Sequence, residues 1–221
     1  MVNAEPPNAG LLSSAASQLV KVSDRSGIAS VLSEACRGIF QPAAVVVYLR
    51  VHETAPFSVA GGFIGETDLH EDSVAPFSPD LPDTLKSGTA LMLEAGDDKF
   101  LERMSGLTLP ASPTVIYAPM CVGNDVLGIL SISAQSHGPF APEQVSTAGV
   151  LSALATVTLH RIIVEGRLLG NEDRYRRIIA QANSVPYERD FESGALRPLG
   201  DGLDAMTGYP IVTAGAPATW K

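Results

Sequence analysis

The chain has 221 residues, of which 45% are hydrophobic and 18% charged, and its net charge is −9. This composition is typical of a globular protein with a buried core, and the acidic balance argues against nucleic acid, whose phosphates are bound by Lys and Arg. No unbroken apolar run has the eighteen residues of a spanning helix. The first ten residues lack the basic flank and apolar core of a signal peptide. We therefore expect a cytoplasmic protein with no membrane or nucleic-acid partner.

Motifs for catalysis and metal binding are missing from the sequence. It has no Gly-rich phosphate loop, no Gly-x-Ser-x-Gly elbow and no His-Glu-x-x-His helix. Cys36 and Cys121 are too few for a disulfide framework, and no His and Cys residues have metal-site spacing. The arginines of "RYRR" (174–177) are read as a solvated helix face. We expect no catalytic residue and no metal.

Two helices are predicted near the N-terminus, after a polar, Pro-containing stretch over residues 1–10 that we expect to be disordered. The first is predicted over 11–22 and the second over 24–40, with Asp24 or Ser26 as its N-cap. Apolar side chains in the second helix repeat at the spacing of one buried stripe. They are Ile28, Val31, Leu32, Ala35 and Ile39.

Strands dominate the middle of the chain. Residues 43–51 and 57–65 are predicted to form an antiparallel hairpin, with Gly61–Gly62 marking a bulge or a close backbone approach. A long loop (66–80), a short helix (81–88), a strand (89–96) and a further short helix (97–106) are expected next. Strands over 114–122 and 126–133 then flank a turn in which Gly123 and Asn124 supply positive φ.

A long helix is predicted from about Pro142 to Leu169, with Gly170–Asn171 acting as a joint after it. It carries two apolar stripes, more than one sheet can cover, so one of them needs a partner. The sequence does not say which stripe packs on the domain's own sheet and which on a partner; we favour the first as the seam of a homodimer. The first stripe contains Ala148, Leu151, Ala155, Thr158, Ile162 and Leu169. The second contains Val150, Leu154, Val157, Val164 and Leu168, and Arg161 interrupts it.

The order of these elements over residues 11–166 resembles a GAF domain. The resemblance is carried by "YAPMCVGNDVLGILSIS", with Pro119, Gly123 and Gly128 at the family's strand and turn positions, and by the helix start "FAPE" at 140–143. It implies an α/β (α+β) fold in which an antiparallel sheet is flanked by N-terminal helices and an exit helix. It also implies a ligand pocket between the other sheet face and the excursion that precedes the last strands. The candidate lining residues are Phe63, Phe100 and Tyr117.

The C-terminal segment is similar to the first half of a PAS domain, in which a helix, a strand, a turn and a second strand lead to a short helix. The stretch Leu203–Tyr209 fits the signature of that helix. We therefore expect a helical linker over 167–183 and a truncated PAS-like segment over 184–221.

The GAF resemblance implies a regulatory sensor module that binds a small ligand and relays it through the exit helix to an output domain, such as a histidine kinase or diguanylate cyclase, outside this chain. Covalent bilin is disfavoured because residues 65–113 contain no cysteine, and only Lys99, Phe100 and Glu102 echo a cyclic-nucleotide signature. Haem stays open, through His52, His70 or His137. The alternatives are a ligand-free dimerisation module and a methionine sulfoxide reductase, which two cysteines do not favour.

Overall fold

The computed structural model describes residues 8–52, 54–78, 80–94, 107, 114–135, 140–182, 187–192 and 196–198. The chain divides into two compact units, residues 1–164 and 165–221. The first unit holds the sheet and the helices that pack on it. The predicted helix over 97–106 lies outside the described residues.

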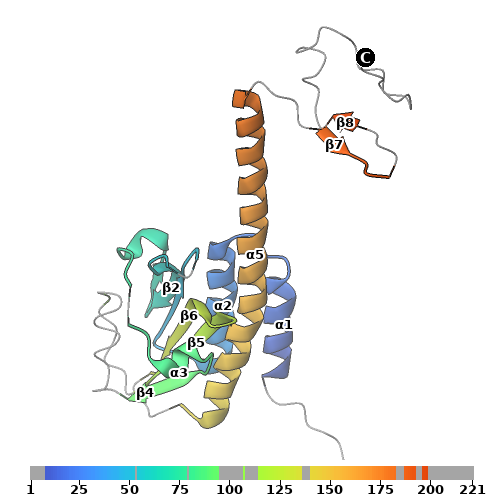
Figure 1. Ribbon diagram of the computed structural model, residues 1–221. Helices are drawn as coiled ribbons and strands as arrows, with labels where there is room; N and C mark the ends of the chain where they lie inside the picture. The colour runs from blue at the N-terminus through green and yellow to red at the C-terminus, as the bar shows by residue number, and fades with distance from the viewer. Residues whose placement is uncertain are drawn as a thin grey trace, which may run out of the picture. The chain divides into compact units, whose positions relative to one another are not determined.

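A six-stranded antiparallel sheet forms the centre of the first unit, with strand order β3-β2-β1-β6-β5-β4 (Figure 1). Its strands are β1 (Ala44–Leu49), β2 (Ser58–Ile64), β3 (Thr67–Leu69), β4 (Leu91–Glu94), β5 (Thr114–Val122) and β6 (Asp125–Ser133). The helices are α1 (Ala9–Leu19), α2 (Arg25–Phe40), the 3-10 turn η1 (Glu71–Ser73), α3 (Asp83–Lys86) and α5 (Pro142–Ala182). The expected α/β (α+β) architecture is confirmed. β3 lies within the predicted loop, so the sheet has one more edge strand than we expected.

The central strands of the sheet carry apolar side chains on both faces, and both faces are buried. One face packs against α2 and α5, with Val45, Val47 and Leu130 among its buried residues, and α1 joins the same apolar cluster through α2 and α5. The opposite face carries a separate buried cluster that includes Tyr48 and Tyr117. Since successive side chains on a strand alternate between faces, this second cluster lies on the side of the sheet away from the three long helices.

Helix α2 begins where the sequence predicts, because Asp24 caps it. The Asp24 Oδ1 atom accepts hydrogen bonds from the Gly27 backbone N–H at 2.7 Å and from the Ser26 hydroxyl at 2.8 Å. Both bonds lower the pKa of Asp24 below its ordinary value, and the bond from Gly27 has the larger effect. Gln41 ends the helix in the left-handed region, with φ +47°.

We expect Asp24→Ala to lower the free energy of unfolding by about 1 kcal/mol, because the cap is lost. Asp24→Asn should keep the cap and the wild-type value at pH 7. Since the folded pKa of Asp24 is depressed, its ionic contribution is present above the unfolded value of 3.8 and is lost as pH falls through the folded value. Denaturant unfolding at pH 7 and pH 3 measures both effects. If Asn and Asp lose stability equally at low pH, the assigned cap is wrong.

Helix α5 is one continuous element of 41 residues, Pro142–Ala182. The expected end of the helix near Leu169 is therefore wrong, because the helix continues through Gly170 and Asn171. The role of these two residues as a joint stays a prediction. Within Pro142–Asn171, 18 consecutive residues reach a mean hydropathy of 1.5, so this helix is long and apolar enough to cross a membrane by length and composition alone. Charged and polar residues interrupt the apolar ones, so no unbroken apolar run marks this helix in the sequence. A third of those 18 residues are buried within the fold, as expected for a helix that packs on a sheet.

The second unit, by itself, contains the last part of α5 and a two-stranded antiparallel hairpin. Its strands are β7 (Tyr187–Arg189) and β8 (Leu196–Pro198), and Glu188 pairs with Arg197. A helix, a strand and a second strand thus follow one another as expected. Leu203–Tyr209 lies outside the described residues, and the assignment of this segment to a PAS domain stays a prediction.

Candidate functional site

A group of buried hydroxyls marks the centre of the sheet face away from the long helices, which we call the hydroxyl face. Tyr117 on β5 pairs directly with Ser131 on β6, and Ser131 pairs with Val46 on β1, two residues from Tyr48. Tyr48 and Tyr117 are fully buried and Ser131 is 1% exposed. The Ser131 Oγ atom is buried and makes no hydrogen bond to the part of the chain that the structure describes. A buried hydroxyl without a partner costs about 1–3 kcal/mol.

Aromatic side chains form one wall of the hydroxyl face. Phe77 pairs with Phe57 through two backbone hydrogen bonds of 2.8 and 2.9 Å, which fasten the segment after η1 to the start of β2. The Phe77 ring then lies edge-on to Tyr48, with the ring centroids 5.5 Å apart. Aromatic side chains beside a buried hydroxyl are among the groups that line small-molecule sites.

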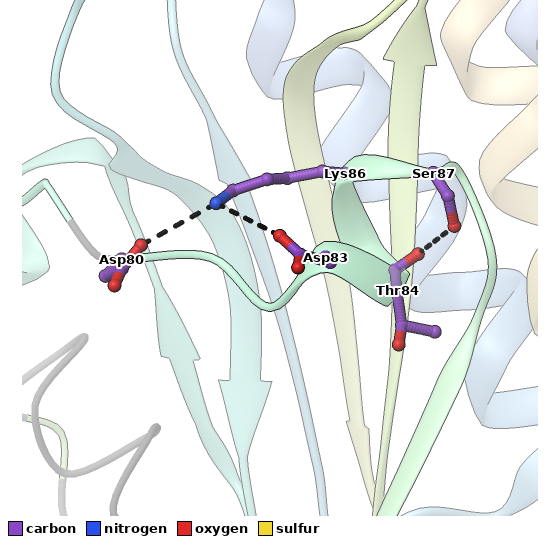
Figure 2. A network of polar contacts seen from close by, with 5 residues as sticks. All are labelled: Asp80, Asp83, Thr84, Lys86 and Ser87. Carbon is purple, nitrogen blue, oxygen red and sulfur yellow. Dashed lines mark hydrogen bonds and ion pairs between the residues drawn. The ribbon is translucent and has the colours of Figure 1, made fainter.

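Helix α3 packs on the same face through Leu85, which is fully buried, and Leu81, two residues before the helix begins, is 8% exposed in the same cluster. The Cys121 thiol of β5 donates to the Leu85 carbonyl at 3.6 Å. Figure 2 shows the outer side of the helix, where the Lys86 ammonium lies 3.7 Å from Asp80 Oδ1 and 3.6 Å from Asp83 Oδ1. These pairs are exposed and add little stability. Burial of the two leucines is therefore what holds α3 on the sheet.

The predicted lining residues do not come together. Tyr117 lies on the hydroxyl face, but Phe63 pairs with Val45 and is buried on the opposite face, under α2. Phe63 and Tyr117 therefore cannot line one pocket. Phe100 lies outside the described residues. Sequence reasoning missed Ser131, although a serine inside the apolar strand "VLGILSIS" was the signal that could have identified it.

Phe63 instead borders an open groove of about 560 Å³ between α2 and the β2–β3 edge. The Arg37 guanidinium lies 3.6 Å from the centre of the Phe63 ring and 3.4 Å from Asp68 Oδ1. The groove also contains Asp24, Glu34 and His70. Acidic and basic groups are mixed along it and Arg37 is already paired, so the groove does not select one kind of ligand.

The remaining candidate residues give no sign of a cofactor or of redox chemistry. His52 is exposed, its Nδ1 lying 3.0 Å from the Thr54 hydroxyl, and His70 caps η1. His137 lies outside the described residues, and within those residues no three His, Cys, Asp or Glu side chains could hold a metal ion. Burial raises the pKa of the Cys36 thiol far above its ordinary range, and burial also raises that of Cys121. Neither thiol is poised as a thiolate nucleophile.

The assignment of the first stripe of α5 to a partner is wrong, because the structure packs that stripe on the domain's own sheet. Leu151, Ala155 and Thr158 are at most 5% exposed and pack within the first unit, so they do not form a seam for a partner. The reason is that this side of α5 faces the sheet: the Ser152 hydroxyl beside it donates to the Pro119 carbonyl of β5 at 3.0 Å. Ile162 is half-buried against the same core, and Leu169 is 65% exposed.

Comparisons with known proteins indicate the same fold. The family model of the GAF domain matches residues 24–159, while no curated protein matches the sequence. The GAF domain of an Acinetobacter phosphoenolpyruvate-protein phosphotransferase is similar in structure, with a TM-score of 0.55, 10% identity, and coverage of 72% of this chain and 95% of that one. The GAF domain of a putative sensor histidine kinase from Pseudomonas syringae pv. tomato gives 0.52 and 12%, with coverage of 74% and 92%.

A free methionine-R-sulfoxide reductase from Neisseria meningitidis, solved with its substrate, gives a TM-score of 0.54 and 14% identity, with coverage of 75% of this chain and 97% of that one. At such identities the likeness shows the fold alone. One fold thus holds both regulatory and catalytic proteins, and the chemistry of the site has to distinguish them.

Proposed function

The chain belongs to the GAF domain family, commonly a sensor or regulatory module in signalling proteins, and we propose that it is the sensor module of a signal-transduction protein. It binds a small ligand on the hydroxyl face and relays the binding through α5 to an output domain outside this chain. A histidine kinase or a diguanylate cyclase suits that output, and the C-terminal segment is the start of a PAS domain. The protein works in the cytoplasm.

The observation that carries this proposal is the buried Ser131 hydroxyl, which makes no hydrogen bond to the described part of the chain. Buried polar groups in folded proteins nearly always have a partner. A ligand with a polar group and an apolar body satisfies Ser131 while it packs against the Tyr48 and Phe77 rings.

The relay follows from contacts that join the hydroxyl face to α5. Tyr117 stands two residues before Pro119, whose carbonyl accepts the hydrogen bond from the Ser152 hydroxyl of α5 at 3.0 Å. A ligand that displaces β5 therefore acts on the buried Ser152 side chain, which ties α5 to that strand. Ligand binding favours one packing of α5 on the sheet, and the shift of that helix is the output.

Two other functions use the same fold. A GAF domain that only dimerises needs no polar group on the hydroxyl face, and the buried Ser131 favours a ligand over that alternative. A methionine sulfoxide reductase needs thiols that exchange disulfides, whereas Cys36 and Cys121 have raised pKa values. The proposal therefore assigns no catalytic activity to this chain, and the output enzyme is a separate domain.

A thermal-shift screen tests the proposal with three kinds of probe: nucleotides, 2-oxo acids and haem. We expect one of them to raise the melting temperature, because a ligand that binds only the folded state stabilises it by about 2.7 kcal/mol at a hundred times its dissociation constant. The visible absorption spectrum of the purified protein reports haem directly. A melting temperature that no probe changes would contradict the proposal.

A further inference from the structure

We propose that Arg161 couples the position of α5 to the folding of α1, so that a shift of α5 releases the C-terminal end of α1. The contacts involved, which we call the α1 clamp, join two side chains of α5 to three carbonyls at the end of α1. They are the side chains of Thr158 and Arg161 and the carbonyls of Leu19, Val20 and Val22. The cause of the shift rests on the proposed function, whereas the clamp itself needs no ligand.

Helix α1 has no capping residue of its own at its C-terminal end. The last carbonyls of a helix have no partner within it, and a glycine just after the helix or a basic side chain in its last turn commonly satisfies them. α1 has neither, since Val20 and Lys21 follow Leu19 and no basic residue lies in its last turn. With eleven residues, of which Ala15 and Leu19 are buried, α1 is too short to be stable alone. It therefore depends on contacts from other elements.

Helix α5 supplies the missing cap. The Arg161 guanidinium donates to the Val20 carbonyl at 3.0 Å and also to the Val22 carbonyl. The Thr158 hydroxyl donates to the Leu19 carbonyl at 3.2 Å, and both of these residues are buried. A cation at this end of a helix is also stabilised by the helix dipole. Because Thr158 and Arg161 are three residues apart, both project from one side of α5, and that side holds α1.

The α1 clamp is sensitive to the position of α5. A slide by one residue along the helix axis is about 1.5 Å, enough to stretch the bond between Thr158 and Leu19 out of range. The Arg161 Nε atom is buried and makes no hydrogen bond to the described part of the chain. This unsatisfied group offsets part of what the clamp contributes, so the clamp can open. Ser152, which donates to β5, lies on the same helix, so a movement of β5 that shifts α5 also acts on the clamp.

The segment held by the clamp also packs on the first turn of α2. A Cβ atom at Gly27 would lie 2.9 Å from Val22 Cγ1, so the Val22 side chain fills the space beside this glycine. The Gly27 backbone N–H in turn donates to Asp24, the cap of α2. The connection between α1 and α2 is therefore held from two sides, by Arg161 on its carbonyls and by α2 against Val22. Release of the clamp frees one of them.

Amide hydrogen exchange of the full chain measures the clamp. The reporters are the amides of Lys21 and Val22, which close the last turn of α1, and the reference is the Gly65 amide, which donates to a carbonyl at the end of the β1–β2 pair. Arg161→Gln should accelerate exchange at both reporters at least about tenfold, because hydrogen bonds from a charged group are lost, and should leave the reference unchanged. Arg167→Gln is the matched control, since Arg167 is exposed on the same helix, and it should change none of the three.

Two further variants separate the clamp from a general loss of stability. Arg161→Lys keeps the charge but not the fork of donors, so its reporters should exchange at a rate between those of wild type and Arg161→Gln. Reporters that exchange at the wild-type rate in Arg161→Gln would overturn the clamp. So would an Arg161→Gln protein in which the Gly65 reference is accelerated as much as the reporters.

A substitution in α5 away from the clamp tests the coupling itself. Ser152→Val removes the bond to β5 and overpacks the contact, which displaces α5. We expect the reporters to exchange at least about threefold faster than in wild type, as for residues coupled through one element, and no further change when Ser152→Val is added to Arg161→Gln. Ser152→Ala loses the bond without overpacking and should act in the same direction, so the test does not depend on the folding of one variant.

The outcomes distinguish the coupling from the proposed function. Reporters that neither Ser152 variant accelerates, or that accelerate only together with the Gly65 reference, would overturn the coupling. A probe that raises the melting temperature but leaves the reporters unchanged would also overturn it, while the ligand site would stand. A protein that no probe stabilises, but in which both Ser152 variants accelerate the reporters, would contradict only the proposed function.

Discussion

Gly62→Ala is expected to prevent the first unit from folding. A Cβ atom at position 62 would lie 2.1 Å from the Val45 carbonyl oxygen and 3.0 Å from Val46 Cα, both backbone atoms of the neighbouring strand β1. The backbone at Gly62 also has φ +144°, where L residues are rarely found. Because β1 lies in the middle of the sheet, the clash cannot be relieved by moving a flexible side chain. We expect a loss of more than about 4 kcal/mol.

Gly65→Ala separates the clash from the cost of the backbone conformation. Gly65 has φ +57°, but a Cβ there would meet nothing within 4 Å. Only the left-handed conformation is then penalised, by about 1–2 kcal/mol. Circular dichroism and denaturant unfolding compare the two variants. A folded Gly62→Ala protein with the stability of Gly65→Ala would contradict the close approach of β2 to β1.

Leu85→Ala is expected to release α3 from the hydroxyl face. Leu85 is fully buried, and α3 has only four residues, so nothing in its own length holds it in place. Removing a buried leucine side chain costs about 2–5 kcal/mol. We expect the free energy of unfolding to fall by that amount, and the amide of Ser87, which donates to the Asp83 carbonyl, to exchange faster with solvent.

Two substitutions check this prediction. Val51→Ala, at an exposed loop residue, should change stability by less than about 0.5 kcal/mol. Lys86→Ala removes the ion pairs of Figure 2 and should also have little effect, because they are exposed. If Lys86→Ala releases α3 and Leu85→Ala does not, the ion pairs rather than the apolar contacts hold the helix.

Local patterns predicted the elements of the first unit well where turns and caps define them. Asp24 caps α2, and Gly123 has φ +62° in the hairpin between β5 and β6. The expected close approach at Gly61–Gly62 is confirmed by the Val45 oxygen beside Gly62. Asn124 was wrongly given positive φ, because one left-handed residue, Gly123, is enough for this turn.

The face on which a side chain lies could not be read from the sequence in the same way. β2 has a bulge at Ala60, since Val47 pairs with Gly61 and Tyr48 with Val59. An extra residue in a strand changes the side to which the following side chains point, so the face of Phe63 depends on where the bulge falls. The sequence indicated a bulge near this position but not the residue that forms it.

Which apolar stripe of α5 is buried could also not be predicted from the sequence. Periodicity shows how far apart two apolar stripes lie around a helix, but both were apolar enough to be buried. The deciding contacts join residues far apart in the chain, such as Arg161 with the Val20 carbonyl and Ser152 with the Pro119 carbonyl. No local pattern in the sequence contains them.

The comparison of wild-type protein with Ser131→Ala, in the same thermal-shift screen, tests the ligand site most directly. Without a probe, Ser131→Ala should be as stable as wild type or more stable by about 1 kcal/mol, because an unpaired buried hydroxyl is removed. With the nucleotide, 2-oxo acid or haem that raises the wild-type melting temperature, the variant should show less than half of the shift. An equal shift in both proteins, or no shift in wild type, would contradict a ligand site at the hydroxyl face.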